Sequence, residues 1–162
     1  MDLRNMGLSN HCSEERYPPT GICFGCGPVN PQRLQIRSFV RPNWAFFAAW
    51  RLGAHYAAVP GVLSDGIVGS LLDCHCNGGA ACHLMQRDAL MAPPCTVTAT
   101  YPIKLFQPTP ADTKPAREAR AIKSTADRAR VEGSLSADGT ICATCTGTFG
   151  AAKPGHAAYH RW

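Results

Sequence analysis

Hydrophobic and polar residues alternate along the second half of the chain, and this period of two predicts β-strands. The alternating runs cover residues 96–105, 115–125, 129–136 and 140–149. Ala137-Asp138-Gly139 separates the last two runs, and Asp-Gly between alternating runs favours a tight hairpin. Two apolar runs earlier in the chain, residues 34–40 and 44–52, predict two further strands.

A single helix is expected between these two groups of strands. Residues 67–91 contain no proline, and their apolar positions recur with helical spacing. Ser64 or Asp65 is a suitable N-cap and Pro93 stops the helix, so we expect it over residues 67–86. One long helix with about six antiparallel strands predicts an α+β fold in which the sheet wraps around the helix. The sequence lacks alternating βαβ units, which argues against a parallel nucleotide-binding sheet.

Turn-forming residues divide the 162-residue chain into three parts. Residues 1–33 are rich in Pro, Gly and polar residues and form an irregular leader, residues 34–150 form one domain, and residues 151–162 form a tail. Hydrophobic residues make up 45% of the chain, which is enough for a packed core. We find neither an apolar run of about 18 residues nor an apolar N-terminal signal. We therefore expect a cytoplasmic protein whose nine cysteines are reduced thiols.

The net charge of +5 is carried by lysines and arginines that are scattered along the chain. They form no basic run and are not interleaved with aromatic residues, as they would be along a nucleic-acid track. The charge therefore favours a small anionic ligand, and we expect neither nucleic acid nor a membrane as a partner.

Asp73 is the candidate catalytic residue on the helix. It shares one helical stripe with Gly66, Ser70 and Asn77, and this stripe is small and polar within a mostly apolar helix. Small neighbours leave room for a ligand beside the carboxylate. A carboxylate in a dry cleft has a raised pKa and can serve as a general base or a nucleophile. The alternative is that Asp73 is solvated on an exposed face of the helix.

Ser64-Asp65-Gly66 at the helix start is a second candidate element. These residues cap the helix, and the free N–H of Gly66 together with the helix dipole can polarise a carbonyl oxygen. Gly66 and Asp73 are seven residues apart, which is roughly 10 Å along a helix. One carbonyl cannot touch both groups of the same helix. If both act, two antiparallel copies of the helix form the site at a homodimer interface.

Three segments together carry a family resemblance: PGVLSDGIVGSLLD at 60–73, CFGCGPVNPQRL at 23–34, and the Asp138-Gly139 hairpin before a strand that ends in GTF. They resemble the hotdog-fold acyl-CoA thioesterases of the phenylacetate-pathway type. The resemblance implies a hotdog fold, with a five- to six-stranded antiparallel sheet wrapped around one long central helix. It also implies a homodimer or a dimer of dimers, and no resident cofactor, because CoA is part of the substrate.

The resemblance also implies roles for individual residues. In the family the block reads Pro-Gly-x-x-His-Gly-Gly, followed seven residues later by Asp or Glu. Gly66 matches the glycine whose N–H binds the thioester oxygen, and Asp73 matches the catalytic carboxylate. Ser64 and Asp65 depart from the family's His and Gly, and a carboxylate beside the oxyanion site disfavours negative charge there. The family also has a Ser or Thr on the strand after the helix that orients water. Thr96, Thr98 and Thr100 are the candidates, with Thr98 favoured, and ordinary β-propensity is the alternative explanation for all three.

Two further residues are candidates for substrate binding. His55 lies just before the 60–73 block and is expected to line the acyl pocket, with a surface loop histidine as the alternative. Asn77 lies one turn after Asp73 on the same stripe.

Other functions remain open at this point. A catalytically weak hotdog protein that binds CoA or an acyl ligand is the main alternative. A hotdog hydratase or dehydratase is disfavoured, because this sequence lacks the histidine-bearing catalytic motif expected of those enzymes. Cys23-Phe24-Gly25-Cys26 resembles half of a zinc knuckle, for which His11 and Cys12 would be partners. Our expectation is nevertheless that no metal binds, and that Cys74 and Cys82 lie on the packing stripe of the helix.

Overall fold

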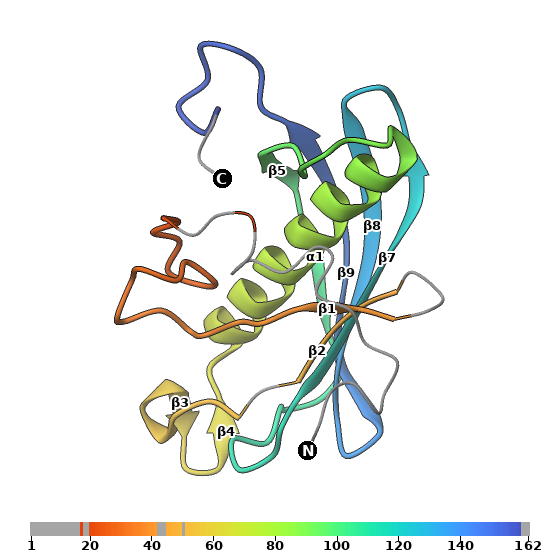
Figure 1. Cartoon of the computed structure of the whole chain (residues 1–162). Helices are drawn as coiled ribbons and strands as arrows, with labels where there is room; N and C mark the ends of the chain where they lie inside the picture. The colour runs from red at the N-terminus through yellow and green to blue at the C-terminus, as the bar shows by residue number, and fades with distance from the viewer. Residues whose placement is uncertain (1–16, 18–19, 42–44, 50, 160–162) are drawn as a thin grey trace.

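The computed structural model describes residues 17, 20–41, 45–49 and 51–159. One long helix lies against one face of a twisted antiparallel sheet, as Figure 1 shows. This is the predicted α+β arrangement, so the expected fold class is confirmed. The sheet forms a single layer on one side of the helix, and residues 20–38 run beside the helix away from the sheet (Figure 1).

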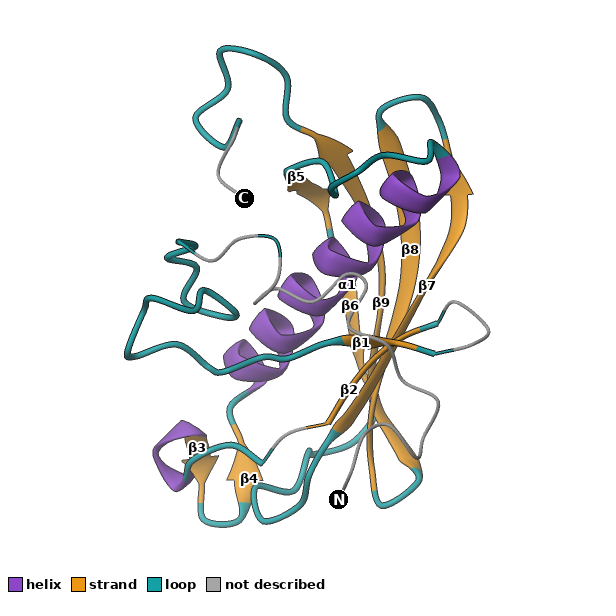
Figure 2. Ribbon diagram, in the orientation of Figure 1, coloured by secondary structure: helices purple, strands orange, loops and turns teal. Residues whose placement is uncertain are grey.

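Seven strands, more than the expected five to six, form the sheet in the order β1-β2-β7-β8-β9-β5, and β6 also pairs with β9. All of these pairings are antiparallel. The strands are β1 (Phe39–Val40), β2 (Phe46–Ala49), β5 (Thr96–Thr100), β6 (Ile103–Leu105), β7 (Ala116–Ser124), β8 (Arg128–Ala137) and β9 (Thr140–Ala151). A separate hairpin of β3 (Ala57–Val59) and β4 (Val62–Leu63) lies near the start of the helix (Figure 2).

The helix α1 spans Asp65–Arg87, with Ser64 as its N-cap. It begins two residues before and ends one residue after the predicted range, within the usual uncertainty of helix ends. Its buried side chains include Val68, Leu71 and Leu72, which form one hydrophobic core with residues of the sheet such as Val131. None of the helices within the described ranges is long and apolar enough to cross a membrane.

The end of α1 is fixed by backbone hydrogen bonds. The N–H of Leu90 donates to the carbonyl of Met85 (2.9 Å), and the N–H of Ala89 donates to that of Gln86 (3.3 Å). This is a Schellman motif, in which the residue after the C-cap adopts the left-handed conformation. Ala89 takes that position with φ 51°. The helix therefore stops because of this local motif before the chain reaches Pro93.

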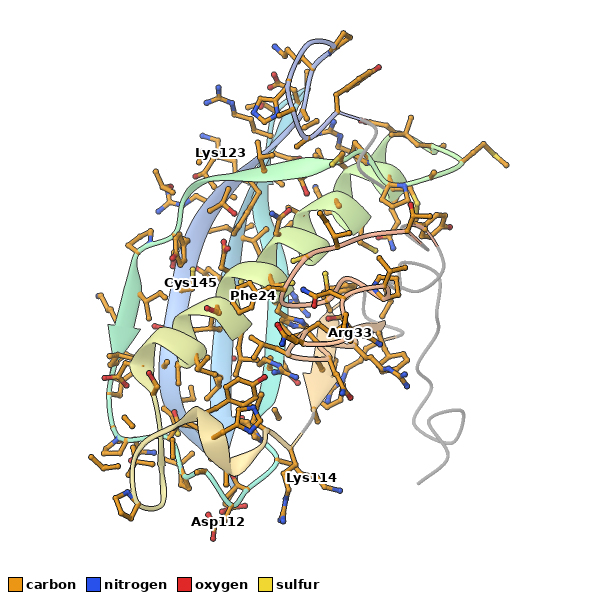
Figure 3. The ribbon with its side chains drawn as sticks, turned by 90° about the vertical axis from the view of Figure 1, so that its left-hand side faces the viewer. Phe24, Arg33, Asp112, Lys114, Lys123 and Cys145 are labelled. Atoms are coloured by element: carbon orange, nitrogen blue, oxygen red, sulfur yellow. The ribbon has the colours of Figure 1, made fainter. Side chains whose placement is uncertain are left out.

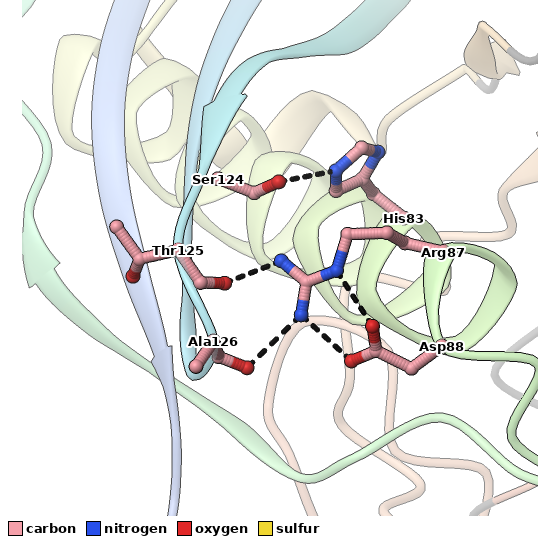
Figure 4. Close-up of polar contacts among 6 residues, drawn as sticks. All are labelled: His83, Arg87, Asp88, Ser124, Thr125 and Ala126. Atoms are coloured by element: carbon pink, nitrogen blue, oxygen red, sulfur yellow. Dashed lines mark hydrogen bonds and ion pairs between the residues drawn. The ribbon is translucent and has the colours of Figure 1, made fainter.

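Arg87 attaches this end of α1 to the turn between β7 and β8, as Figure 4 shows. Its guanidinium donates hydrogen bonds to the carbonyls of Thr125 and Ala126 (3.0 Å for Ala126) and to the carboxylate of Asp88 (2.7 Å). One turn earlier, His83 shares a hydrogen bond of 3.0 Å with Ser124. The helix is thus held in register along the sheet.

The predicted strands are found with three differences. The 34–40 run is paired as a strand only over Phe39–Val40, because the N–H groups of Leu34 and Ile36 bond instead to carbonyls of residues 24 and 25. The 96–105 run is split into β5 and β6 before Ile103, because proline at 102 has no N–H for a ladder. Residues 54–66, whose Pro60, Gly61 and Gly66 predict a loop, instead contain the β3–β4 hairpin. Within the 44–52 run, residues 44 and 50 lie outside the described residues.

The expected hairpin between β8 and β9 is confirmed. Asp138 and Gly139 both have positive φ, 48° and 81°. This matches the two-residue turn whose twist fits that of the flanking strands.

Candidate active site

A cavity of about 380 Å³ lies between the middle of α1, strand β5 and the N-terminal loop. The loop contributes residues 21–27, and β5 and the residue after it contribute Val97, Thr98 and Tyr101. The residues from α1 are Ser70, Asp73, Cys74, Asn77 and Gly78. Figure 3 shows the loop, marked by Phe24 and Arg33, lying beside the helix.

Asp73, Thr98 and Asn77 form a hydrogen-bonded network in this cavity. The Thr98 hydroxyl donates to Oδ1 of Asp73 (2.7 Å) and accepts from Nδ2 of Asn77 (3.4 Å). The Thr96 hydroxyl donates to Oδ1 of Asn77 and so orients that amide. Three residues proposed from the sequence are therefore brought together by the packing of α1 against β5.

The Asp73 carboxyl is half-buried, and this burial raises its pKa above the ordinary value. The hydrogen bond from Thr98 acts in the opposite direction, because it stabilises the charged form. Negative charge at Cys23 is a further, smaller cause of the rise. Asp73 therefore lies in a partly desolvated cleft and is not solvated on an open helix face.

Ser64, Asp65 and Gly66 lie at the start of α1 and do not line the Asp73 cavity. Gly66 is exposed, and the geometry of a first helical turn leaves its N–H without a partner inside the helix. Asp65 is also exposed, and its charge faces the positive end of the helix dipole. The Ser64 backbone is extended, as a cap requires, although its side chain makes no capping hydrogen bond.

His55 also lies outside the cavity that contains Asp73. It is exposed on a short 3-10 helix, Ala54–Tyr56, and its ring is tilted by 45° against that of Tyr56, with the ring centroids 4.0 Å apart. Within one chain it is therefore not placed to contact a ligand bound beside Asp73.

Cys74 makes a contact that the sequence did not predict. It packs against the hydrophobic core, as expected for the packing stripe, but its sulfur also lies with those of Cys23 and Cys26, and the three are within 4.8 Å of one another. Hydrogen bonds from the thiols of Cys26 and Cys74 lower the pKa of Cys23. The hydrogen bonds of Cys74 with Cys23 and with Cys26 raise the pKa of Cys74. His11 and Cys12, which the sequence suggested as further zinc ligands beside Cys23 and Cys26, lie outside the described residues.

The expectation that all nine cysteines are reduced is wrong for Cys82, which is disulfide-bonded. Seven other cysteines within the described ranges are not disulfide-bonded: Cys23, Cys26, Cys74, Cys76, Cys95, Cys142 and Cys145.

The sequence matches no protein-family model and no curated protein. Its fold does match solved structures. A thioesterase superfamily protein from Shewanella loihica is 24% identical with a TM-score of 0.62, over 73% of this chain and 91% of that one. A putative thioesterase related to phenylacetic acid degradation, from Ralstonia eutropha, is 20% identical with a TM-score of 0.55, over 65% and 75% of the two chains.

A third match is the BH2602 protein from Bacillus halodurans, solved with CoA. It is 22% identical with a TM-score of 0.59, over 75% of this chain and 77% of that one. At these identities the matches establish a shared fold. The chain thus has the hotdog fold that the sequence resemblance implied, in common with solved thioesterase superfamily proteins.

Proposed function

We propose that this protein hydrolyses an acyl-CoA thioester to a free acid and CoA. The observation that carries the proposal is the Asp73 carboxylate, half-buried in a cavity and hydrogen-bonded to Thr98 at 2.7 Å. The hotdog fold is shared with solved thioesterases, and one protein of this fold was solved with CoA. The net charge of +5 is compatible with a polyanionic substrate.

In the proposed reaction, Asp73 accepts a proton from water as the water oxygen attacks the thioester carbonyl carbon. Thr98 fixes the carboxylate through Oδ1 and helps to orient the water. The carbon–sulfur bond then breaks, the free acid forms, and the proton held by Asp73 leaves with the CoA thiol. Direct attack of the carboxylate on the carbonyl is the other route, and it would pass through an anhydride that water opens.

The oxyanion is proposed to be held by the Gly66 N–H of a second protomer. Within one chain Gly66 does not line the cavity of Asp73, so the two groups act together only across an interface. A Cβ at Gly66 would meet only Ser64 Oγ, at 3.7 Å. Gly66→Val should therefore fold normally while its side chain obstructs the approach of the carbonyl oxygen.

A weak enzyme that mainly binds CoA or an acyl ligand is the second candidate. Asp65 favours it, because an exposed carboxylate next to Gly66 opposes negative charge on the substrate oxygen. Asp65 would then slow the reaction without destabilising the fold, since its negative charge stabilises the start of α1.

The test measures thiol release from short, medium, long and aryl acyl-CoAs by wild type and Asp73→Asn. We expect turnover to fall about a hundredfold to ten-thousandfold in Asp73→Asn, with the fold retained, because Asn preserves an acceptor for Thr98. Equal activity of the two proteins would overturn the mechanism. Tight CoA binding without release of thiol would favour the second candidate.

The shared site is tested by producing Asp73→Asn and Gly66→Val chains together. Each variant alone is expected to be inactive. Random pairing makes half of the dimers mixed, and each mixed dimer has one intact site, so about a quarter of wild-type activity should return. A mixture as inactive as its parts would show that each site is built from one chain.

A further inference from the structure

Three cysteine sulfurs meet at the contact between the N-terminal loop and α1. Cys23 and Cys26 come from the loop and Cys74 from the helix, and their Sγ atoms all lie within 4.8 Å of one another. Zinc–sulfur bonds of about 2.3 Å in a tetrahedron place the sulfurs roughly 3.8 Å apart. The cluster thus needs only a small contraction to bind one ion.

The loop holds its two cysteines in a compact turn. The N–H of Gly27 donates to the carbonyl of Cys23 (2.8 Å), and the N–H of Gly25 donates to the sulfur of Cys23 (3.4 Å). An N–H that points at a sulfur stabilises a thiolate and orients it as a ligand. The backbone of this turn therefore already supplies a hydrogen bond that would orient the Cys23 sulfur as a metal ligand.

Close packing brings the third sulfur to this turn. A Cβ on Gly25 would lie 2.9 Å from the sulfur of Cys74, so only glycine lets the loop approach the helix this closely. The N–H groups of Leu34 and Ile36 donate to the carbonyls of Phe24 and Gly25 (2.7 and 3.1 Å) and hold the loop there. Leu34 and Ile36 are themselves buried apolar residues of the core. The arrangement of the three sulfurs is thus fixed by the fold.

We propose that Cys23, Cys26 and Cys74 bind one Zn²⁺ ion, which clamps the N-terminal loop to α1. Three thiolates form a soft donor set that suits zinc. All three cysteines line the cavity that contains Asp73, so water from the cavity can take the fourth position. On binding, three zinc–sulfur bonds form, the three thiols release their protons to solvent, and the hydrated ion gives up bound waters in exchange, with no change of oxidation state. The ion forms part of the wall of the cavity.

The test begins with the zinc content of the full chain, purified without chelator. We expect about one zinc per chain in wild type and in Cys95→Ala, and a large loss in Cys74→Ala and Cys26→Ala. Cys95 is the matched control because it is a free, buried cysteine outside the cluster. Less than about 0.2 zinc per wild-type chain would overturn the proposal.

Cobalt gives a readout that does not depend on whether the variants fold. Co²⁺ added to zinc-free wild type should produce intense thiolate-to-metal absorption, at one ion per chain, that zinc then displaces. Chelation of wild type should lower its unfolding temperature by about 10 °C, and should leave Cys74→Ala unchanged. Weak cobalt bands without thiolate character, or a Cys23–Cys26 disulfide under reducing conditions, would contradict the metal site.

The outcome is independent of the proposed hydrolysis. Asp73→Asn retains all three sulfurs and should contain as much zinc as wild type. Zinc in a protein without turnover would support the metal site and count against the thioesterase proposal. Turnover by a wild type that contains no zinc would support the thioesterase and overturn the metal site.

Discussion

The Thr98 hydroxyl donates a 2.7 Å hydrogen bond to the Asp73 carboxylate and so joins β5 to the middle of α1. A threonine hydroxyl has a single proton, and that of Thr98 is used in the hydrogen bond to Asp73. The Thr98 oxygen in turn accepts a hydrogen bond from Nδ2 of Asn77 at 3.4 Å. The orientation of the proposed base therefore depends on a residue that is 25 positions away in the chain.

Thr98→Val tests this dependence, because it keeps the shape of the side chain and removes the hydroxyl. We expect turnover of the best acyl-CoA to fall about tenfold to a hundredfold with KM nearly unchanged, since a hydrogen bond to a charged group is lost. Steady-state kinetics measure the effect. Thr100→Val, at an exposed position of the same strand, is the control and should match wild type. A Thr98→Val enzyme with full turnover would remove Thr98 from the mechanism.

Asp65→Asn should change rate and stability in opposite directions. Removing the charge beside Gly66 should raise turnover severalfold, because the proposed oxyanion no longer faces a carboxylate. The same change should lower the free energy of unfolding by about 0.3–1 kcal/mol, because an acid in the first turn favours the helix dipole. Kinetics and urea unfolding measure the two effects. Glu132→Asn, exposed on β8, serves as the charge control. Slower turnover in Asp65→Asn would assign Asp65 a positive role.

Ala89→Gly should stabilise the protein. Ala89 takes the left-handed position that ends α1, with φ 51°, where a Cβ costs about 1 kcal/mol and glycine has no such cost. We expect the free energy of unfolding to rise by about 0.5–1 kcal/mol in urea titrations. Ala92→Gly, three residues later at a position without positive φ, should be neutral or destabilising. If both substitutions destabilise equally, the Schellman end of α1 is not formed in solution.

His75 makes stability depend on pH. Its ring is fully buried, and burial, followed by the charge of Arg117, lowers its pKa from 6.5 to about 3. Nε2 donates to the carbonyl of Phe46 (3.1 Å), so in the neutral ring Nδ1 accepts from the Ser38 hydroxyl (2.9 Å).

Because the pKa is lower in the folded state, the unfolded chain binds the proton first as the pH falls below 6.5. His75 has no such effect above that pH. Below it, the free energy of unfolding should decrease by about 1.4 kcal/mol per pH unit until the pH approaches the folded value. Urea unfolding at several pH values measures the slope, and His75→Gln should flatten it. An NMR spectrum that shows a protonated His75 ring in folded protein at pH 5 would contradict the prediction.

Short-range spacing was sufficient to predict much of this molecule. The period of two over residues 140–149 predicts β9, Asp138-Gly139 predicts its hairpin, and the helical spacing predicts α1. These patterns are readable because strand and helix geometry repeats over a few residues. The placement of Asp73 and Asn77 on one stripe follows from the same periodicity, since residues three or four apart share a helix face.

The tertiary structure decided which face of the helix meets which partner. A helical wheel groups Cys74 with Leu71, and both contact the core, but only Cys74 also reaches the sulfurs of the N-terminal loop. The sequence also left several threonines of one strand as candidates, and only the packing of β5 on α1 brought Thr98 to Asp73. Such contacts depend on how the chain closes over long sequence separations and on the twist of the sheet. No local spacing encodes either of these, so the cysteine cluster becomes visible only in the folded chain.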